Sequence, residues 1–260
     1  MKNYGKEWKR RLKAGEFIHG GHVFLPNPQM AEAMACYGYE YLWIDGEHGS
    51  YDKEEYYNHI TAVNGAGCGA FVRVTANEPT LIKPVLEMGP DGIIVPMICT
   101  AEEAAAFVSA CTYPPKGTRG FGPRRARRYD AMNVNDYLET IDDSLVKIVQ
   151  IEHIKGIENL DAICEVPGLD AITVGPFDLS ASMGLLGQLM HPDSQAACRR
   201  IVEKCKAHKI PIGPSLGFGN QEYVNFWMGL KPDYIFCGDD LGFVKTGTEA
   251  TIKMIKDLRK

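Results

Sequence analysis

The sequence contains no apolar run of the roughly 18 residues that a membrane-spanning helix needs. Its first residues, Met1 to Glu16, carry many charges where a secretory signal peptide needs an apolar segment. These absences argue against a membrane partner and favour a cytoplasmic protein. The chain also lacks low-complexity tracts and any linker that would divide it, so we expect one domain over residues 1–260.

The eight cysteines are scattered and form no C-x-x-C pair. Most lie among apolar neighbours, which is typical of buried, reduced thiols and does not indicate a zinc site. An excess of basic residues is also missing, because 28 Lys and Arg are outnumbered by 33 Asp and Glu, for a net charge of -5. Nucleic-acid binding needs a concentrated basic surface, so we expect no nucleic-acid partner.

The sequence does contain a nearly unbroken alternation of short apolar, β-branched runs with longer helical patterns. The predicted strands are Phe17–Phe24, Tyr41–Ile44, Ala70–Val74, Gly92–Val95, Leu145–Ile151, Ala171–Val174, Ile210–Ile212 and Tyr234–Cys237. Helical spacing predicts helices that include Pro28–Cys36, Pro79–Met88, Ala101–Cys111, Ile157–Cys164, Ala196–His208 and Gln221–Met228. Strict alternation favours a closed (β/α)8 TIM barrel over a doubly wound open sheet, although periodicity alone does not prove closure.

One segment interrupts the alternation, at residues 113–130, and it is rich in Pro, Gly and Arg. The arginines of residues 119–128 suggest phosphate or nucleic-acid binding. However, the Gly-Phe-Gly at residues 120–122 lacks the strand-then-helix context of a dinucleotide fingerprint. Long loops in compact domains are usually functional or form interfaces, so we expect an active-site rim or a subunit contact here.

Polar residues stand at the ends of several predicted strands. In a parallel barrel the carboxyl ends of the strands build the active site, so we expect these side chains to meet at one mouth. They are Asp45, Glu47, His48, Arg73, Gln150, Glu152 and Asp178. Glu152 and Asp178 could together hold a hard divalent ion and leave positions for water and a 2-oxo acid. The structural alternative is that Asp178 caps a helical turn and Glu152 pairs with a lysine.

Two further residues of this set suit catalysis. The guanidinium of Arg73 matches a carboxylate and can stabilise an enolate oxygen, although a salt bridge within the mouth is the alternative. His48 lies in Asp45-Gly46-Glu47-His48-Gly49, where the glycines let the chain turn sharply. Its ordinary pKa lies near neutrality, so it is interpreted either as a general base or as a structural histidine.

Several motifs together resemble the HpcH/HpaI aldolase family, and the likeness runs from about residue 10 to 245. The motifs are Trp43 to His48, Val72 to Val74, Val95 to Met97, Tyr113 to Gly120, Gln150 to Glu152 and Val174 to Gly184. Better-known members cleave 4-hydroxy-2-oxoheptanedioate, 2-keto-3-deoxyrhamnonate or 2-dehydro-3-deoxyglucarate. The resemblance implies a barrel of the phosphoenolpyruvate/pyruvate-domain type, commonly hexameric, that binds Mg2+, Mn2+ or Co2+.

The resemblance also implies a role for each matching residue. Glu152 and Asp178 would ligate the metal, Arg73 would stabilise the enolate, and Gln150, with the backbone at Phe177, would line the pyruvate site. His48 matches the family's base, Asp45 matches an acidic position beside it, and Glu87 stands where an aspartate usually supports that base. The sequence departs from the family at Phe177, which replaces a usual alanine, and in the arginine-rich loop.

The expected reaction is therefore metal-dependent, class II cleavage of a 4-hydroxy-2-oxo acid to pyruvate and an aldehyde, performed by a homo-oligomer. A Schiff-base aldolase is the closest rival, but it needs a desolvated lysine at a strand end, and Lys147 and Lys155 are poor candidates. Two more distant rivals are a related barrel lyase that acts on a CoA thioester or phosphonate, and a non-catalytic keto-acid-binding protein.

Overall fold

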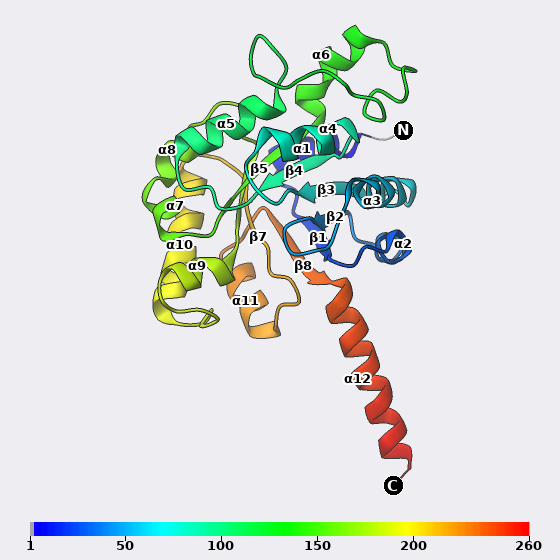
Figure 1. Ribbon diagram of the computed structural model, residues 1–260. Helices are drawn as coiled ribbons and strands as arrows, with labels where there is room; N and C mark the ends of the chain where they lie inside the picture. Colours follow the sequence, from blue (N-terminus) through cyan, green and yellow to red (C-terminus); the bar gives the residue numbers. More distant parts are fainter. Residues whose placement is uncertain (1–2, 260) are drawn as a thin grey trace.

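The computed structural model describes residues 3–259 and shows eight parallel strands with helices around them (Figure 1). Strands β1 to β7 lie side by side in chain order, each paired with its neighbours, and β8 pairs with β1. The strands are β1 (Ile18–Val23), β2 (Tyr41–Asp45), β3 (Gly69–Arg73), β4 (Gly92–Val95), β5 (Val146–Ile151), β6 (Ala171–Val174), β7 (Ile212–Pro214) and β8 (Tyr234–Asp239). The predicted (β/α)8 TIM barrel is confirmed.

The barrel closes between β7 and β8. Ser215 forms a parallel bridge with Phe236, and the N–H of Leu216 donates to the Phe236 carbonyl at 2.9 Å. Every residue of β2 to β7 is buried, because one face of each strand lines the interior and the other packs under helices. This double burial explains why the strands read as continuous apolar runs in the sequence.

The helices fill the connections between strands. Two of them, α3 and α5, begin with capping boxes at Asp52 and Thr100, in which side chain and backbone satisfy each other's hydrogen bonds. The helices are α1 (Tyr4–Lys13), α2 (Pro28–Cys36), α3 (Lys53–Gly65), α4 (Pro79–Glu87), α5 (Ala101–Cys111), α6 (Val134–Ser144), α7 (Ile154–Glu158), α8 (Leu160–Cys164), α9 (Pro176–Ser182), α10 (Pro192–Ala207), α11 (Gln221–Gly229) and α12 (Asp240–Leu258). None of these helices is long and apolar enough to cross a bilayer.

The core has two layers, one inside the barrel and one between strands and helices. The inner layer is unusually aromatic, and α1 supplies Trp8 to its amino-terminal end. The Trp8 ring lies 5.7 Å from that of Phe71 and 5.3 Å from that of Tyr234, centroid to centroid. Burying such rings contributes several kcal/mol in total, at about 25 cal/mol per Å² of apolar surface. The amino-terminal end of the barrel is thus filled, which leaves the opposite end for a site.

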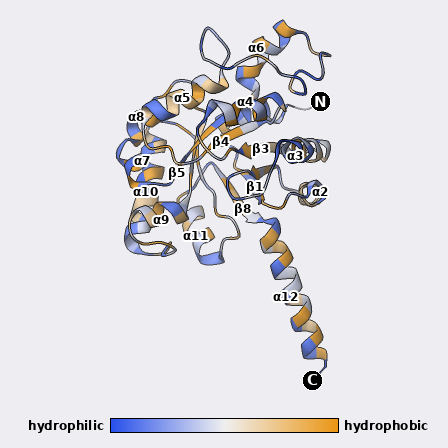
Figure 2. Cartoon of the chain, in the orientation of Figure 1, coloured by the Kyte–Doolittle hydropathy of each residue, from blue (hydrophilic) through white to orange (hydrophobic). Residues whose placement is uncertain are grey.

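The last helix, α12, departs from this arrangement and extends away from the barrel (Figure 1). Apolar and polar residues alternate along it (Figure 2). Its exposed apolar side chains are Leu241, Phe243, Val244, Ile252, Met254, Ile255 and Leu258. The exposure of so many apolar side chains to water along one helix is unfavourable. Such an exposed apolar surface is typical of a site that packs against another protein surface.

Candidate active site

The carboxyl ends of the strands surround a cavity of about 310 Å³. Polar side chains from both sides of the barrel line it. Six of the residues predicted from the sequence are among them: Asp45, His48, Arg73, Gln150, Phe177 and Asp178. The strand ends therefore meet at one mouth, as expected from the parallel arrangement.

Arg73, the last residue of β3, is held rigidly in this mouth. Its Nε donates to Asp45 Oδ1 at 3.0 Å, and its Nη2 pairs with Asp45 Oδ2. Its Nη1 forms an ion pair with Glu47 at 2.6 Å, and the guanidinium lies over the Trp43 ring. Arg73 is only 4% exposed, so a buried, oriented positive charge sits at the floor of the cavity.

Asp45 also shapes the loop that carries His48. Its Oδ1 accepts the backbone N–H of Glu47 and of His48, both at 3.1 Å. The intervening Gly46 is required by close packing, because an added Cβ would lie 2.8 Å from the Arg73 carbonyl oxygen. The result is that His48 stands exposed at the mouth while Asp45 beneath it is fully buried.

A chain of hydrogen bonds joins Arg73, which lines the cavity, to Glu152, which is buried behind the lining residues and does not line the cavity itself. Arg73 Nη1 donates to Gln150 Oε1 at 3.4 Å, and Gln150 Nε2 donates to Glu152 Oε2 at 2.6 Å. The backbone N–H of Met97 donates to Glu152 Oε1 at 2.7 Å. Both oxygens of Glu152 are therefore fixed, and Gln150 couples the carboxylate to the cationic side of the mouth.

The electrostatics of Glu152 favour an added cation. Burial is the main cause that raises the pKa of Glu152 to about 7. The Met97 N–H and Arg73 oppose this shift, whereas the negative charges of Glu47 and Asp178 add to it. Burial likewise raises the pKa of Glu47, although Arg73 opposes the shift. The positive charge around these carboxylates does not fully balance their negative charge. Such oxygen atoms form a set of donors that suits Mg2+ or Mn2+.

Asp178 and Phe177 lie in the first turn of α9, directly after β6. Both side chains are exposed toward the mouth, with Phe177 at 54%. Gly175, which precedes the helix, packs against the carboxylate network, because an added Cβ would lie 2.3 Å from Glu152 Oε2 and 2.4 Å from Gln150 Nε2. Within residues 3–259, no three His, Cys, Asp or Glu side chains gather into a group that could hold a metal ion.

The structure adds a second polar wall that the sequence analysis missed. His22, Ser215 and Asp239, from the ends of β1, β7 and β8, line the side of the cavity away from Gln150 and Asp178. His22 Nε2 lies 2.8 Å from Ser215 Oγ, and its Nδ1 lies 3.3 Å from the Gly238 carbonyl oxygen. Burial lowers the pKa of His22 to about 4, so its ring is neutral. The signal in the sequence was that two histidines, His19 and His22, lie inside a predicted strand whose other residues are apolar or glycine.

Glu87 does not join the other predicted residues. It lies at the end of α4, pairs with Lys83 at 3.6 Å and packs against Gly122. It does not line the cavity, and in the described part of the chain it makes no contact with His48. Its predicted support of His48 therefore has no geometric basis within one chain.

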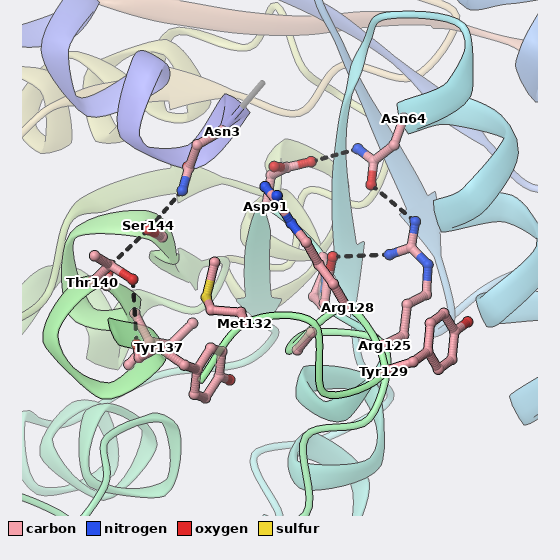
Figure 3. A pocket seen from close by; sticks show the side chains of 14 residues that line it. Asn3, Asn64, Asp91, Arg125, Arg128, Tyr129, Met132, Tyr137, Thr140 and Ser144 are labelled. Carbon is pink, nitrogen blue, oxygen red and sulfur yellow. Dashed lines mark hydrogen bonds between the residues drawn. The ribbon is translucent and has the colours of Figure 1, made fainter. Parts of the chain in front are cut away.

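The arginine-rich loop also lies away from the mouth. Arg119 is buried, donating to the Leu86 carbonyl and lying 4.5 Å above the Tyr113 ring. Arg125 donates to the Met88 carbonyl and to Asn64, beside a separate cavity of about 330 Å³ (Figure 3). In residues 3–259 none of the loop arginines lines the mouth, so the rim interpretation is not supported within one chain and the subunit contact stays a prediction.

Comparisons with known proteins show which family this chain resembles over most of its length. The sequence model of the HpcH/HpaI aldolase/citrate lyase family matches residues 21–219. A hydroxypyruvate/pyruvate aldolase of Roseobacter denitrificans is 38% identical over 197 residues, which cover 76% of this chain and 77% of the relative. A 5-keto-4-deoxy-D-glucarate aldolase of Salmonella arizonae is 34% identical over 249 residues, 95% of each chain.

A solved structure shows the same architecture. An HpcH/HpaI aldolase/citrate lyase family protein of Burkholderia cenocepacia J2315 has a TM-score of 0.90 and 30% identity, over 96% of this chain and 99% of its own. The fold and the sequence likeness therefore agree, and the resemblance inferred from the motifs is confirmed. This chain belongs to the HpcH/HpaI aldolase/citrate lyase family.

Proposed function

We propose that this protein is a metal-dependent pyruvate aldolase that reversibly cleaves a 4-hydroxy-2-oxo acid to pyruvate and an aldehyde. The observation that carries the proposal is the hydrogen-bonded chain from Arg73, in the lining of the mouth, through Gln150 to Glu152 behind it. This chain connects the positive charge of Arg73 to the carboxylate of Glu152. The negative charges of Glu47 and Asp178 also act on that carboxylate. A 2-oxo acid carries adjacent carboxylate and keto oxygens, which suit such a pair of sites.

Glu152 and Asp178 are the proposed ligands of a divalent ion, Mg2+, Mn2+ or Co2+. The fit rests on oxygen donors, on the raised pKa of Glu152, and on the charge of Asp178 acting on it. Two carboxylates would leave room for water and the 2-oxo acid as further oxygen ligands of such an ion. When bound there, the ion supplies Lewis acidity that draws electron density from a keto oxygen.

The proposed catalytic steps use residues of the chain. His48, exposed at the mouth, takes the proton of the 4-hydroxyl group as the bond between C3 and C4 breaks. The bonding electrons pass into the enolate of pyruvate, the new carbonyl leaves as the aldehyde, and a proton taken up at C3 then converts the enolate to pyruvate. Arg73 stabilises the enolate oxygen, because Asp45 and Glu47 already hold its guanidinium in place. Gln150 and Phe177 line the pocket for the pyruvate portion.

A panel of 4-hydroxy-2-oxo acids tests the proposal. We expect pyruvate release with Mg2+, Mn2+ or Co2+, loss of activity in excess chelator, and recovery on adding metal back. Pyruvate formation can be followed by coupled oxidation of NADH. No pyruvate from any member of the panel with any of the three metals would exclude the aldolase and favour a keto-acid-binding protein.

The same assay separates the Schiff-base alternative. Among residues 3–259 no lysine lines the mouth cavity. Lys147 lies near the opposite end of the barrel and Lys155 near the start of α7. Borohydride with pyruvate should therefore leave the mass of the protein unchanged, and a trapped pyruvyl adduct would contradict the metal mechanism.

We also propose that the protein is a homo-oligomer, with a hexamer expected from family likeness. The support is the exposed apolar surface of α12. Replacing Ile252 and Ile255 together by glutamate should reduce the mass measured by light scattering, while circular dichroism stays unchanged. Lys253→Glu, an exposed change on the same helix, is the matched control. An unchanged mass in the double variant would rule out association through this part of α12.

A further inference from the structure

The second polar wall of the mouth has a defined hydrogen-bonding character. A backbone carbonyl can only accept, so the proton of the neutral His22 ring lies on Nδ1, which faces the Gly238 carbonyl. Nε2 then carries a lone pair and accepts the hydroxyl proton of Ser215, 2.8 Å away. This leaves the lone pairs of Ser215 Oγ available to accept a hydrogen bond from a ligand. His22 is only 1% exposed, so its orientation is fixed by the surrounding barrel.

Asp239 provides further hydrogen-bond acceptors on this wall of the cavity. It is buried beside the cavity, and its Oδ1 accepts the backbone N–H of Gly242 at 2.6 Å. The carboxyl group also accepts the backbone N–H of Phe218, and its Oδ2 lies 3.8 Å from the position a Cβ on Gly217, another lining residue, would take. Together, Ser215 and Asp239 present acceptors and negative charge to whatever occupies this half of the mouth.

Positive charge is nearly absent from the cavity. Among its described lining residues, Arg73 is the one arginine or lysine, and it is already paired with Asp45 and Glu47. The charge of Arg73 reaches His22, but its two carboxylate partners already offset it, so a ligand carboxylate on the His22 side would meet acceptors with little net positive charge to balance it, which is unfavourable in a partly dry site. A ligand hydroxyl would instead find acceptors for its proton.

We propose that His22, Ser215 and Asp239 form the subsite for the aldehyde half of the substrate, and that it selects short, uncharged hydroxyaldehydes. The inference rests on the proposed aldolase function and names its substrate class. His22 acts as a positioning residue, because it orients the Ser215 hydroxyl. Ser215 and Asp239 are the groups that contact the ligand. Phe24 and Phe218, which line the same cavity, limit its length.

The test compares matched aldehydes in the direction of addition to pyruvate. Glycolaldehyde and propanal have the same heavy-atom count but differ by one hydroxyl, and succinic semialdehyde adds a carboxylate. Each is measured as kcat/KM with wild type, Ser215→Ala, Asp239→Asn and Thr173→Val. Thr173 is a matched control, since it is a buried hydroxyl of the neighbouring strand that bonds to Gly213 and does not line the cavity.

Wild type should prefer glycolaldehyde to propanal and use succinic semialdehyde worst. Ser215→Ala should lower the ratio of glycolaldehyde to propanal kcat/KM about three- to ten-fold, the usual effect of one neutral hydrogen bond. Asp239→Asn should raise relative use of succinic semialdehyde, and Thr173→Val should keep the wild-type ratios. Using ratios within one variant removes any general effect on folding or turnover.

Exchange of the pyruvate methyl protons with D2O, followed by proton NMR, needs no aldehyde and reports enolate formation alone. Wild type that forms the enolate, but whose glycolaldehyde preference survives Ser215→Ala, would overturn the subsite. Wild type that neither exchanges these protons nor adds any aldehyde would overturn the aldolase function itself. The two failures are therefore distinguishable.

Discussion

Replacing Arg73 with alanine is expected to lower kcat/KM for pyruvate release by about 10²- to 10³-fold, the usual cost of removing a fixed donor to a developing oxyanion. Arg73 is held by Asp45 and Glu47 and is joined to Glu152 through Gln150, so it requires no reorganisation when charge develops. The measurement is steady-state kinetics with saturating metal.

Stability must be separated from turnover in this variant, because Asp45 is fully buried and would lose its charged partner. Removing one partner of a buried ion pair lowers the free energy of unfolding by roughly 3–5 kcal/mol. The double variant Arg73→Ala, Asp45→Asn removes the orphaned charge and should recover part of the thermal stability, but none of the activity. Near-normal cleavage by Arg73→Ala would show that the enolate is stabilised elsewhere.

Gly175→Ala should weaken metal activation by about 10- to 100-fold, the usual cost of disturbing the groups that orient metal ligands. The added methyl group would lie 2.3 Å from Glu152 Oε2 and 2.4 Å from Gln150 Nε2, so the two side chains must move. The backbone of Gly175 has φ of -96°, which alanine adopts freely, and the effect therefore comes from contact and not from backbone strain.

The control for this variant is Gly65→Ala, at the end of α3, where an added Cβ meets nothing within 4 Å. It should leave the metal dependence of pyruvate release unchanged. Both variants should show native circular dichroism. If Gly175→Ala has the metal activation curve of wild type, the contact between this turn and Glu152 has no bearing on the metal site.

The barrel could be predicted from sequence because each strand is buried on both faces and each is followed by helical spacing. Strand seven was placed two residues early, at Ile210–Ile212, whereas β7 is Ile212–Pro214. Proline has no backbone N–H and usually argues against a strand, so the predicted strand ended before Pro214. The apolar pair Ile210 and Ile212, on either side of Pro211, was therefore interpreted as the whole strand. The extension of α12 away from the barrel could not be predicted, since periodicity shows an apolar face but not what covers it.

The candidate site was predictable where polar residues end apolar runs, as at Arg73 and Glu152. It was not predicted at His22, which lies inside an apolar run, or at Ser215, which follows a short one. The sequence pattern does not distinguish a buried structural histidine from a histidine that lines a cavity. Glu87 shows the opposite limit. Its position in a family pattern suggested support for His48. Within one chain α4 places it beside Lys83 and Gly122, so that support stays a prediction.

Mn2+ binding followed by electron paramagnetic resonance tests whether Glu152 and Asp178 together hold a divalent ion. Wild type should bind one Mn2+ per chain. Because the pKa of Glu152 is raised to about 7 and the ion needs the ionised carboxylate, binding should weaken below about pH 7 and level off above it. Glu152→Gln and Asp178→Asn should each bind Mn2+ at least about ten-fold more weakly. Two variants that bind Mn2+ as tightly as wild type would contradict the account.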